Sequence, residues 1–139
     1  MNAMRLRNDD LKTLPSVKRV ALDDEAVAGI ETMARTLGLR VIDVDLAGCH
    51  DKAGLLDRTA RALGFADDVP RQWGAWFDAL IDLHWQPAGA GYAILLRRAL
   101  RLQQTAPESL DTALALLEDA ARVWASRGVT LRAFVDAEV

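Results

Sequence analysis

The sequence predicts an α/β fold in which a three-stranded parallel sheet is packed by helices. Three short runs of β-branched or apolar residues, at 41–46, 92–96 and 129–135, are separated by longer segments whose apolar residues recur at helical spacing. Strands that alternate with helices are joined by right-handed crossovers into a parallel sheet. The 139 residues are enough for one domain with its own core.

An N-terminal extension, residues 1–38, precedes this sheet. Residues 1–16 show no sustained periodicity and predict an irregular arm, and residues 17–22 are compatible with a short strand. Asp23 and Asp24 are N-cap candidates for a helix over 24–37, which Gly38 would end. We therefore expect a helical extension, with a preceding strand left open, before a domain that spans residues 39–139.

The first half of that domain begins with the strand at 41–46, in which every second residue is a large aliphatic side chain. Asp51 can cap the following helix, and Gly64 supplies its stop. The pattern then predicts a further helix over residues 72–83.

The second half contains the strand at 92–96, which is apolar throughout and is expected to be buried on both faces. Thr105 and Glu108 have the spacing of a capping box, and Pro107 fits the first turn of a long helix. This helix leads to the last strand, at 129–135.

Composition excludes several functional classes. No apolar run approaches the length of a membrane span, and the first residues lack the pattern of a signal peptide, so a cytoplasmic protein is expected. The net charge of −3 and the pI of 5.3 argue against a nucleic-acid ligand and favour a basic partner. Cys49 is the only cysteine, which excludes an internal disulfide and a structural cysteine-type metal site. No metal and no cofactor are expected.

The helix predicted over residues 72–83 has two different faces. Trp73, Trp76, Leu80 and Leu83 share one face, which we assign to the core. The opposite face carries Gly74, Phe77, Asp78, Ile81 and Asp82. A merely solvated face would explain the aspartates, but a carboxylate flanked by Phe77 and Ile81 suits a docking surface better.

Residues 65–85 resemble the loop and helix by which barstar proteins inhibit secreted ribonucleases. The residues that fall in register with the family pattern are Phe65, Asp67, Trp73, Ala75, Asp78, Leu80, Asp82 and Leu83. Residues 91–96 resemble the family's central strand, and residues 124–129 resemble its last helix-to-strand joint. The resemblance covers roughly residues 39–136 and implies a barstar-like fold.

The resemblance also implies a function and a set of partner-binding residues. Asp78 would take the place of an RNA phosphate in the active site of a basic secreted ribonuclease or related toxin. The chain would thereby act as an immunity protein of a bacterial cell. Phe77 matches an interface aromatic, and Gln72 replaces the asparagine that helps to start the helix. The remaining expected contacts are Gly74, Asp68, Ile81 and Asp82.

The sequence departs from the family at two acidic positions. Gly74 stands where the family has the first aspartate of the helix, and Val123 stands at an acidic contact of the last helix. Asp67 and Asp68 in the loop offer substitute negative charge. These departures leave open a partner other than the ribonuclease that the family usually inhibits, and a regulatory or interaction module with a non-nuclease partner is the first alternative.

A small hydrolase is the other alternative. It would use His50 with Asp51, or His84 with Asp82, as an acid/base or metal pair. Each pair is a close neighbour in sequence, and no third group accompanies it. Helix termini explain both histidines more simply: His50 would cap the start of one helix, and His84 would lie at the C-terminal end of another, where a cation is favourable. No enzymatic activity is therefore expected.

Overall fold

The computed structural model describes residues 16–65, 72–82 and 89–136. The elements are, in order, β1 (Val17–Val20), α2 (Asp24–Leu37), β2 (Leu39–Asp45), α3 (Lys52–Leu63), α4 (Trp73–Leu80), β3 (Gly91–Arg97), α5 (Leu100–Thr105), α6 (Pro107–Ser126) and β4 (Thr130–Asp136). The predicted α/β class is confirmed. Within the described ranges, no helix is both long enough and apolar enough to cross a membrane.

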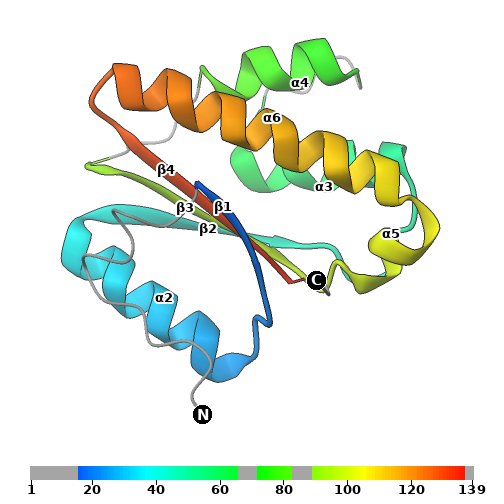
Figure 1. Cartoon of the computed structure of the whole chain (residues 1–139), viewed down its shortest axis with the longest axis horizontal. Helices are drawn as coiled ribbons and strands as arrows, with labels where there is room; N and C mark the ends of the chain where they lie inside the picture. The colour runs from blue at the N-terminus through cyan, green and yellow to red at the C-terminus, as the bar shows by residue number, and fades with distance from the viewer. Residues whose placement is uncertain (1–15, 66–71, 83–88, 137–139) are drawn as a thin grey trace.

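The sheet has four parallel strands in the order β1-β4-β3-β2, one more than the sequence predicted (Figure 1). The additional strand is β1, which pairs with β4 so that Val17 lies opposite Ala133. The sequence indicated only a possible strand over residues 17–22, and the structure has one over Val17–Val20, with Lys18 and Arg19 at its centre. The extension therefore contributes directly to the sheet.

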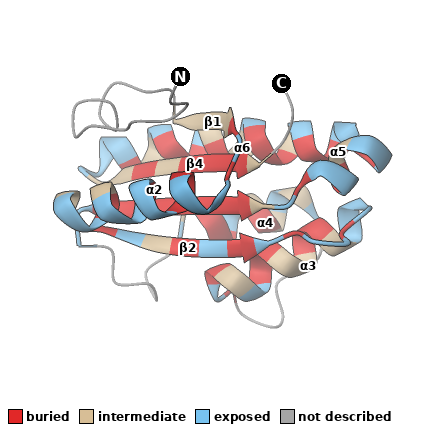
Figure 2. Cartoon of the chain, turned by 90° about the horizontal axis from the view of Figure 1, so that it is seen from below, coloured by how far each residue is buried: buried red, intermediate tan, exposed pale blue. Residues whose placement is uncertain are grey.

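Helices cover both faces of the sheet, as Figure 1 shows: α2 lies on one face, and α3, α4 and α6 lie on the other. In β3, Tyr92, Ile94 and Leu96 belong to the large core beneath α3, α4 and α6. Leu95 packs with Ile30 of α2 in a second core on the opposite face. Two covered faces explain why residues 92–96 of β3 are all apolar and buried, and Figure 2 shows the strand between β4 and β2 as largely buried.

The helix starts and stops follow local chemistry. The Asp23 carboxylate accepts from the Ala26 N–H at the start of α2, and Asp51 accepts from the Gly54 N–H at the start of α3. Gly38 ends α2 in the left-handed conformation, with φ of 76°. These predicted caps are confirmed.

The predicted capping box at Thr105 is wrong. Thr105 is the last residue of α5, and its hydroxyl donates to the carbonyl oxygens of His50, at 2.6 Å, and Arg101, at 2.9 Å. Ala106 occupies the N-cap position of α6, which has no side-chain capping bond. The short helix α5 uses the hydroxyl that the sequence pattern assigned to α6.

Candidate functional site: the exposed side of helix α4

The inner side of α4 is anchored on α3 by a buried hydrogen bond. The Trp76 side chain is 2% exposed, and its indole N–H donates to the Thr59 hydroxyl at 2.7 Å. The Thr59 hydroxyl in turn donates to the Leu55 carbonyl at 2.8 Å. The ring of Trp73 meets that of Trp76 edge to face, with centroids 5.4 Å apart. These contacts fix the rotation of α4 about its own axis.

The C-terminal end of α4 is held by α6. The indole N–H of Trp124 donates to the Leu80 carbonyl at 3.2 Å, and the Arg127 guanidinium donates to the Ile81 carbonyl at 2.7 Å. Arg127 also lies over the Trp124 ring, 4.9 Å from its centroid. The two donors satisfy carbonyl groups that a helix end leaves without partners, and the cation is favourable at that end.

The predicted phase of the helix agrees with the structure. Trp76 and Leu80 are buried, Asp78 is exposed, and Phe77 and Ile81 are half-buried against the large core. Trp73 is only half-buried, because it lies at the start of α4 with the Lys52 ammonium 5.7 Å from its ring centroid. Leu83 lies outside the described residues.

We name the outward residues of this segment the α4 surface: Gln72, Gly74, Phe77, Asp78, Ile81 and Asp82. Asp78 makes no ion pair with another described residue. Its carboxylate therefore projects from a fixed helix between two partly exposed apolar side chains. This arrangement can receive a cationic group and exclude water around it.

Gln72 and Gly74 lie at the start of this surface. Gln72 occupies the N-cap position of α4, but its side chain makes no capping hydrogen bond. The amide therefore does not support the helix start as the resemblance implied. A Cβ atom added at Gly74 would meet no other atom within 4 Å, so the position has room for a side chain.

Asp68, the loop residue expected to add negative charge, lies outside the described residues, and so does His84. Val123 is half-buried on α6. Arg127 was not among the predicted site residues. The hydrogen bond of Arg127 to the Ile81 carbonyl joins positions 46 apart in sequence. The only local signal is the i, i+3 spacing of Trp124 and Arg127, which indicates that these two side chains contact each other.

The alternative hydrolase pair does not form a catalytic arrangement. The Nε2 atom of His50 lies 3.7 Å from Oδ2 of Asp51, and both side chains are more than half exposed. Asp51 caps α3, so the predicted capping role of His50 is wrong. Burial raises the pKa of the Cys49 thiol, which disfavours a thiolate nucleophile. Among the described residues, no group of three histidine, cysteine or acidic side chains could hold a metal ion.

Comparison with known proteins agrees with the family resemblance of residues 65–85. The family model for Barstar (barnase inhibitor) matches residues 39–136, which include α4 and extend from the start of β2 to the end of β4. No curated protein matches the chain in sequence.

Proposed function

Because the chain belongs to the barstar family, we propose that it is a protein inhibitor that plugs the active site of a basic secreted ribonuclease with its α4 surface. Proteins of this family are inhibitors rather than enzymes. The proposed role is that of a cytoplasmic immunity protein in a bacterial cell that makes the ribonuclease. The observation that carries the proposal is the exposed Asp78 carboxylate between Phe77 and Ile81 on an anchored helix.

The physical argument rests on mimicry of phosphate. A ribonuclease active site gathers cationic side chains to bind the RNA backbone, and a carboxylate in the same pocket forms charge-assisted hydrogen bonds with them. Phe77 and Ile81 would exclude water from these bonds, which strengthens them. Because Trp76, Trp124 and Arg127 already hold α4, little conformational entropy would be lost on binding.

A second candidate keeps the surface and changes the partner. Gly74 and Val123 remove two carboxylates that the family pattern would place around Asp78. A pocket that carries fewer cations, in a related toxin or a non-nuclease protein, would match this reduced charge better.

The test is a titration of basic secreted ribonucleases with the parent chain and with Asp78→Lys. The parent should inhibit RNA cleavage at a one-to-one ratio, and the charge reversal should relieve inhibition while leaving the far-ultraviolet circular dichroism unchanged. If the parent inhibits no ribonuclease at saturating concentration, the nuclease proposal is wrong and the interaction-module candidate takes its place. Equal inhibition by both chains would remove α4 from the interface.

A further inference from the structure

The outer edge of β2 is open along the part of the chain that the structure describes. The sheet order places β2 at one margin, and Figure 2 shows it there with no described strand on its outer side. It is seven residues long, whereas β1 at the other margin has four. An edge strand presents unpaired N–H and C=O groups and is a template for another strand.

The hydrogen bonds of the sheet show which groups face outward. The Leu46 N–H donates to the Arg97 carbonyl, at 2.8 Å. Since alternate residues bond to the same neighbour in a parallel pair, Leu39, Val41 and Asp43 direct their backbone groups away from β3. Asp45 follows the same rule, because its carbonyl accepts from the Arg58 guanidinium of α3 at 3.1 Å. Arg58 thus closes one end of the edge, and Leu39 at the other end forms an isolated antiparallel bridge with Gly89. Between them, residues 40–43 have no described strand on their outer side.

A groove with two opposite charges runs beside this open edge. It has a volume of about 330 Å³ and is lined by Glu31 and Arg35 of α2 and by Leu39 and Val41 of β2. Glu31 and Arg35 are one helical turn apart and exposed, and neither makes an ion pair with another described residue. The floor of the groove is apolar.

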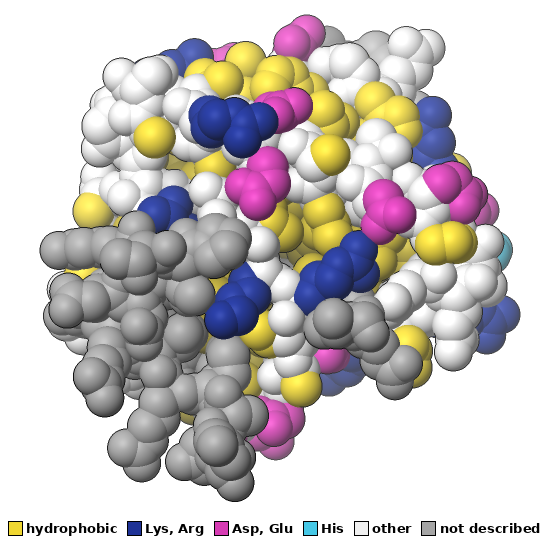
Figure 3. All heavy atoms as spheres, viewed as in Figure 1, with side chains coloured by type: hydrophobic (Ala, Val, Ile, Leu, Met, Phe, Trp, Pro, Cys, Tyr) yellow, Lys and Arg dark blue, Asp and Glu magenta, His cyan; other side chains and the backbone are white. Residues whose placement is uncertain are grey.

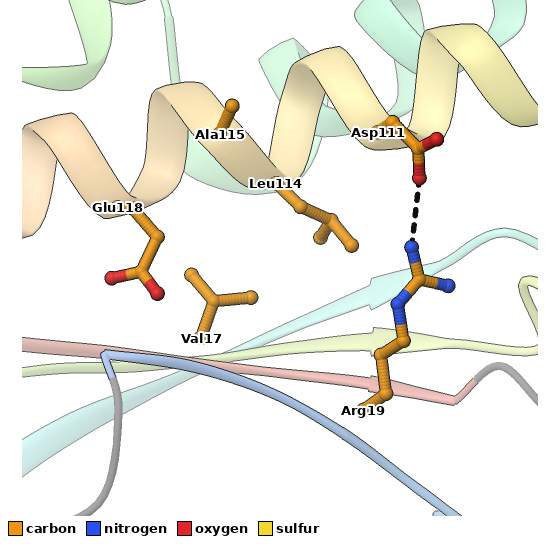
Figure 4. A pocket seen from close by; sticks show the side chains of 6 residues that line it. All are labelled: Val17, Arg19, Asp111, Leu114, Ala115 and Glu118. Atoms are coloured by element: carbon orange, nitrogen blue, oxygen red, sulfur yellow. Dashed lines mark hydrogen bonds and ion pairs between the residues drawn. The ribbon is translucent and has the colours of Figure 1, made fainter. Parts of the chain in front are cut away.

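At the opposite edge of the sheet, Arg19 of β1 is paired with Asp111 of α6. There, α6 lies alongside β1, and Figure 4 shows the Arg19–Asp111 ion pair, 2.8 Å long, reaching across a groove of about 280 Å³. Figure 3 shows the same side of the molecule, with apolar side chains ringed by charges of both signs. Arg19 is therefore already paired within the chain and is not available to pair with a second copy.

We infer that the β2 edge is the interface of a homodimer, in which two copies of β2 pair antiparallel around Val41 across a two-fold axis. A two-fold interface needs a self-complementary surface, and an acid and a base separated by an apolar centre supply one. Glu31 of each copy then faces Arg35 of the other, and the two Val41 side chains meet near the axis. The α4 surface lies on the other face of the sheet from α2, so both copies keep it free (Figure 1).

The first test is a charge swap, followed by sedimentation over a dilution series. The parent should dimerise. Glu31→Arg or Arg35→Glu should each weaken dimerisation about tenfold or more, because each variant places two like charges opposite each other at both symmetric positions of the interface. The double variant restores opposite charges and should return the dissociation constant to within about threefold of the parent. Arg19→Glu, at the β1 edge, is the matched control and should leave dimerisation unchanged.

The second test addresses the backbone. The Val41 N–H points outward, so Val41→Pro should spare the internal ladder and abolish dimerisation. Thermal unfolding of each variant checks that the fold is kept. If the proline variant does not fold, the charge-swap experiment alone tests the inference. A parent chain that stays monomeric at its solubility limit overturns the inference. So does a dimer that the single charge reversals do not weaken.

Discussion

The indole N–H of Trp76 donates to the hydroxyl of Thr59 at 2.7 Å, and this buried bond joins α4 to α3. Thr59 is 1% exposed and Trp76 is 2% exposed, so water cannot replace either partner. The bond fixes which side of α4 faces outward, and the position of Asp78 depends on it.

Thr59→Val should therefore lower the free energy of unfolding by about 1–3 kcal/mol, because it leaves a buried indole N–H without an acceptor. Thr59→Ser keeps the hydroxyl and should cost less. Denaturant titration of both variants, of Trp76→Phe and of the Thr59→Val/Trp76→Phe pair gives a double-mutant cycle. If the two single effects add without a coupling term, the bond does not contribute to stability as we argue.

Arg127→Met should loosen the end of α4 without unfolding the sheet. The change removes the bond to the Ile81 carbonyl and a cation near a helix C-terminus, which together contribute about 0.5–1.5 kcal/mol. Hydrogen exchange should become faster at the α4 amides and stay unchanged in β3. Arg122→Met, on the same helix but paired with Asp119, is the control. Equal protection of α4 in both variants would contradict the anchoring role of Arg127.

Acid should destabilise the fold partly through Asp45. The Ala47 N–H, and then the Arg98 guanidinium, lower the pKa of this carboxyl below its usual 3.8. The folded state therefore favours the charged form, so the contribution is present above the unfolded pKa and is lost as the pH falls through the folded pKa. Urea midpoints measured from neutral pH to below 3.8 should fall less steeply for Asp45→Asn than for the parent. Parallel curves would exclude this contribution.

Local signals explain most of what the sequence predicted. An N-cap aspartate, a left-handed glycine stop and the period of a helix each depend on residues within a few positions, so Asp23, Asp51 and Gly38 are placed correctly. The predicted capping box was wrong because the Thr105 hydroxyl could serve either the end of α5 or the start of α6. Its contact with the carbonyl of His50, 55 residues away in sequence, favours the end of α5.

The anchoring of α4 could not be predicted for the same reason. The acceptors of Trp76 and Trp124 lie 17 and 44 positions away in sequence, and only the packed fold brings them together. The exposed side of α4 could be predicted, because a helix phase follows from spacing alone. The partner that this side binds stays a prediction.

At the α4 surface, Asp78→Ala should weaken binding of the natural partner by more than about 2 kcal/mol, a size typical of central hot-spot residues, for which barstar itself is a known example. Asp82→Ala, at the rim, should cost much less. Loss of the central carboxylate should mainly speed dissociation, while added salt should mainly slow association. Surface plasmon resonance over a salt series separates the two rates. Equal affinities of the parent and Asp78→Ala would show that this helix is not the interface.

Gly74→Asp should strengthen inhibition of the secreted ribonuclease that the family usually binds, because it restores a carboxylate one turn before Asp78. The position has room for a side chain. Replacing glycine inside a helix should also raise the free energy of unfolding by a few tenths of a kcal/mol up to about 1 kcal/mol. Gly74→Ala shares this helix effect without the charge, so comparing the inhibition constants of the two variants isolates the carboxylate. If alanine improves inhibition as much as aspartate, helix rigidity and not charge limits binding at this position.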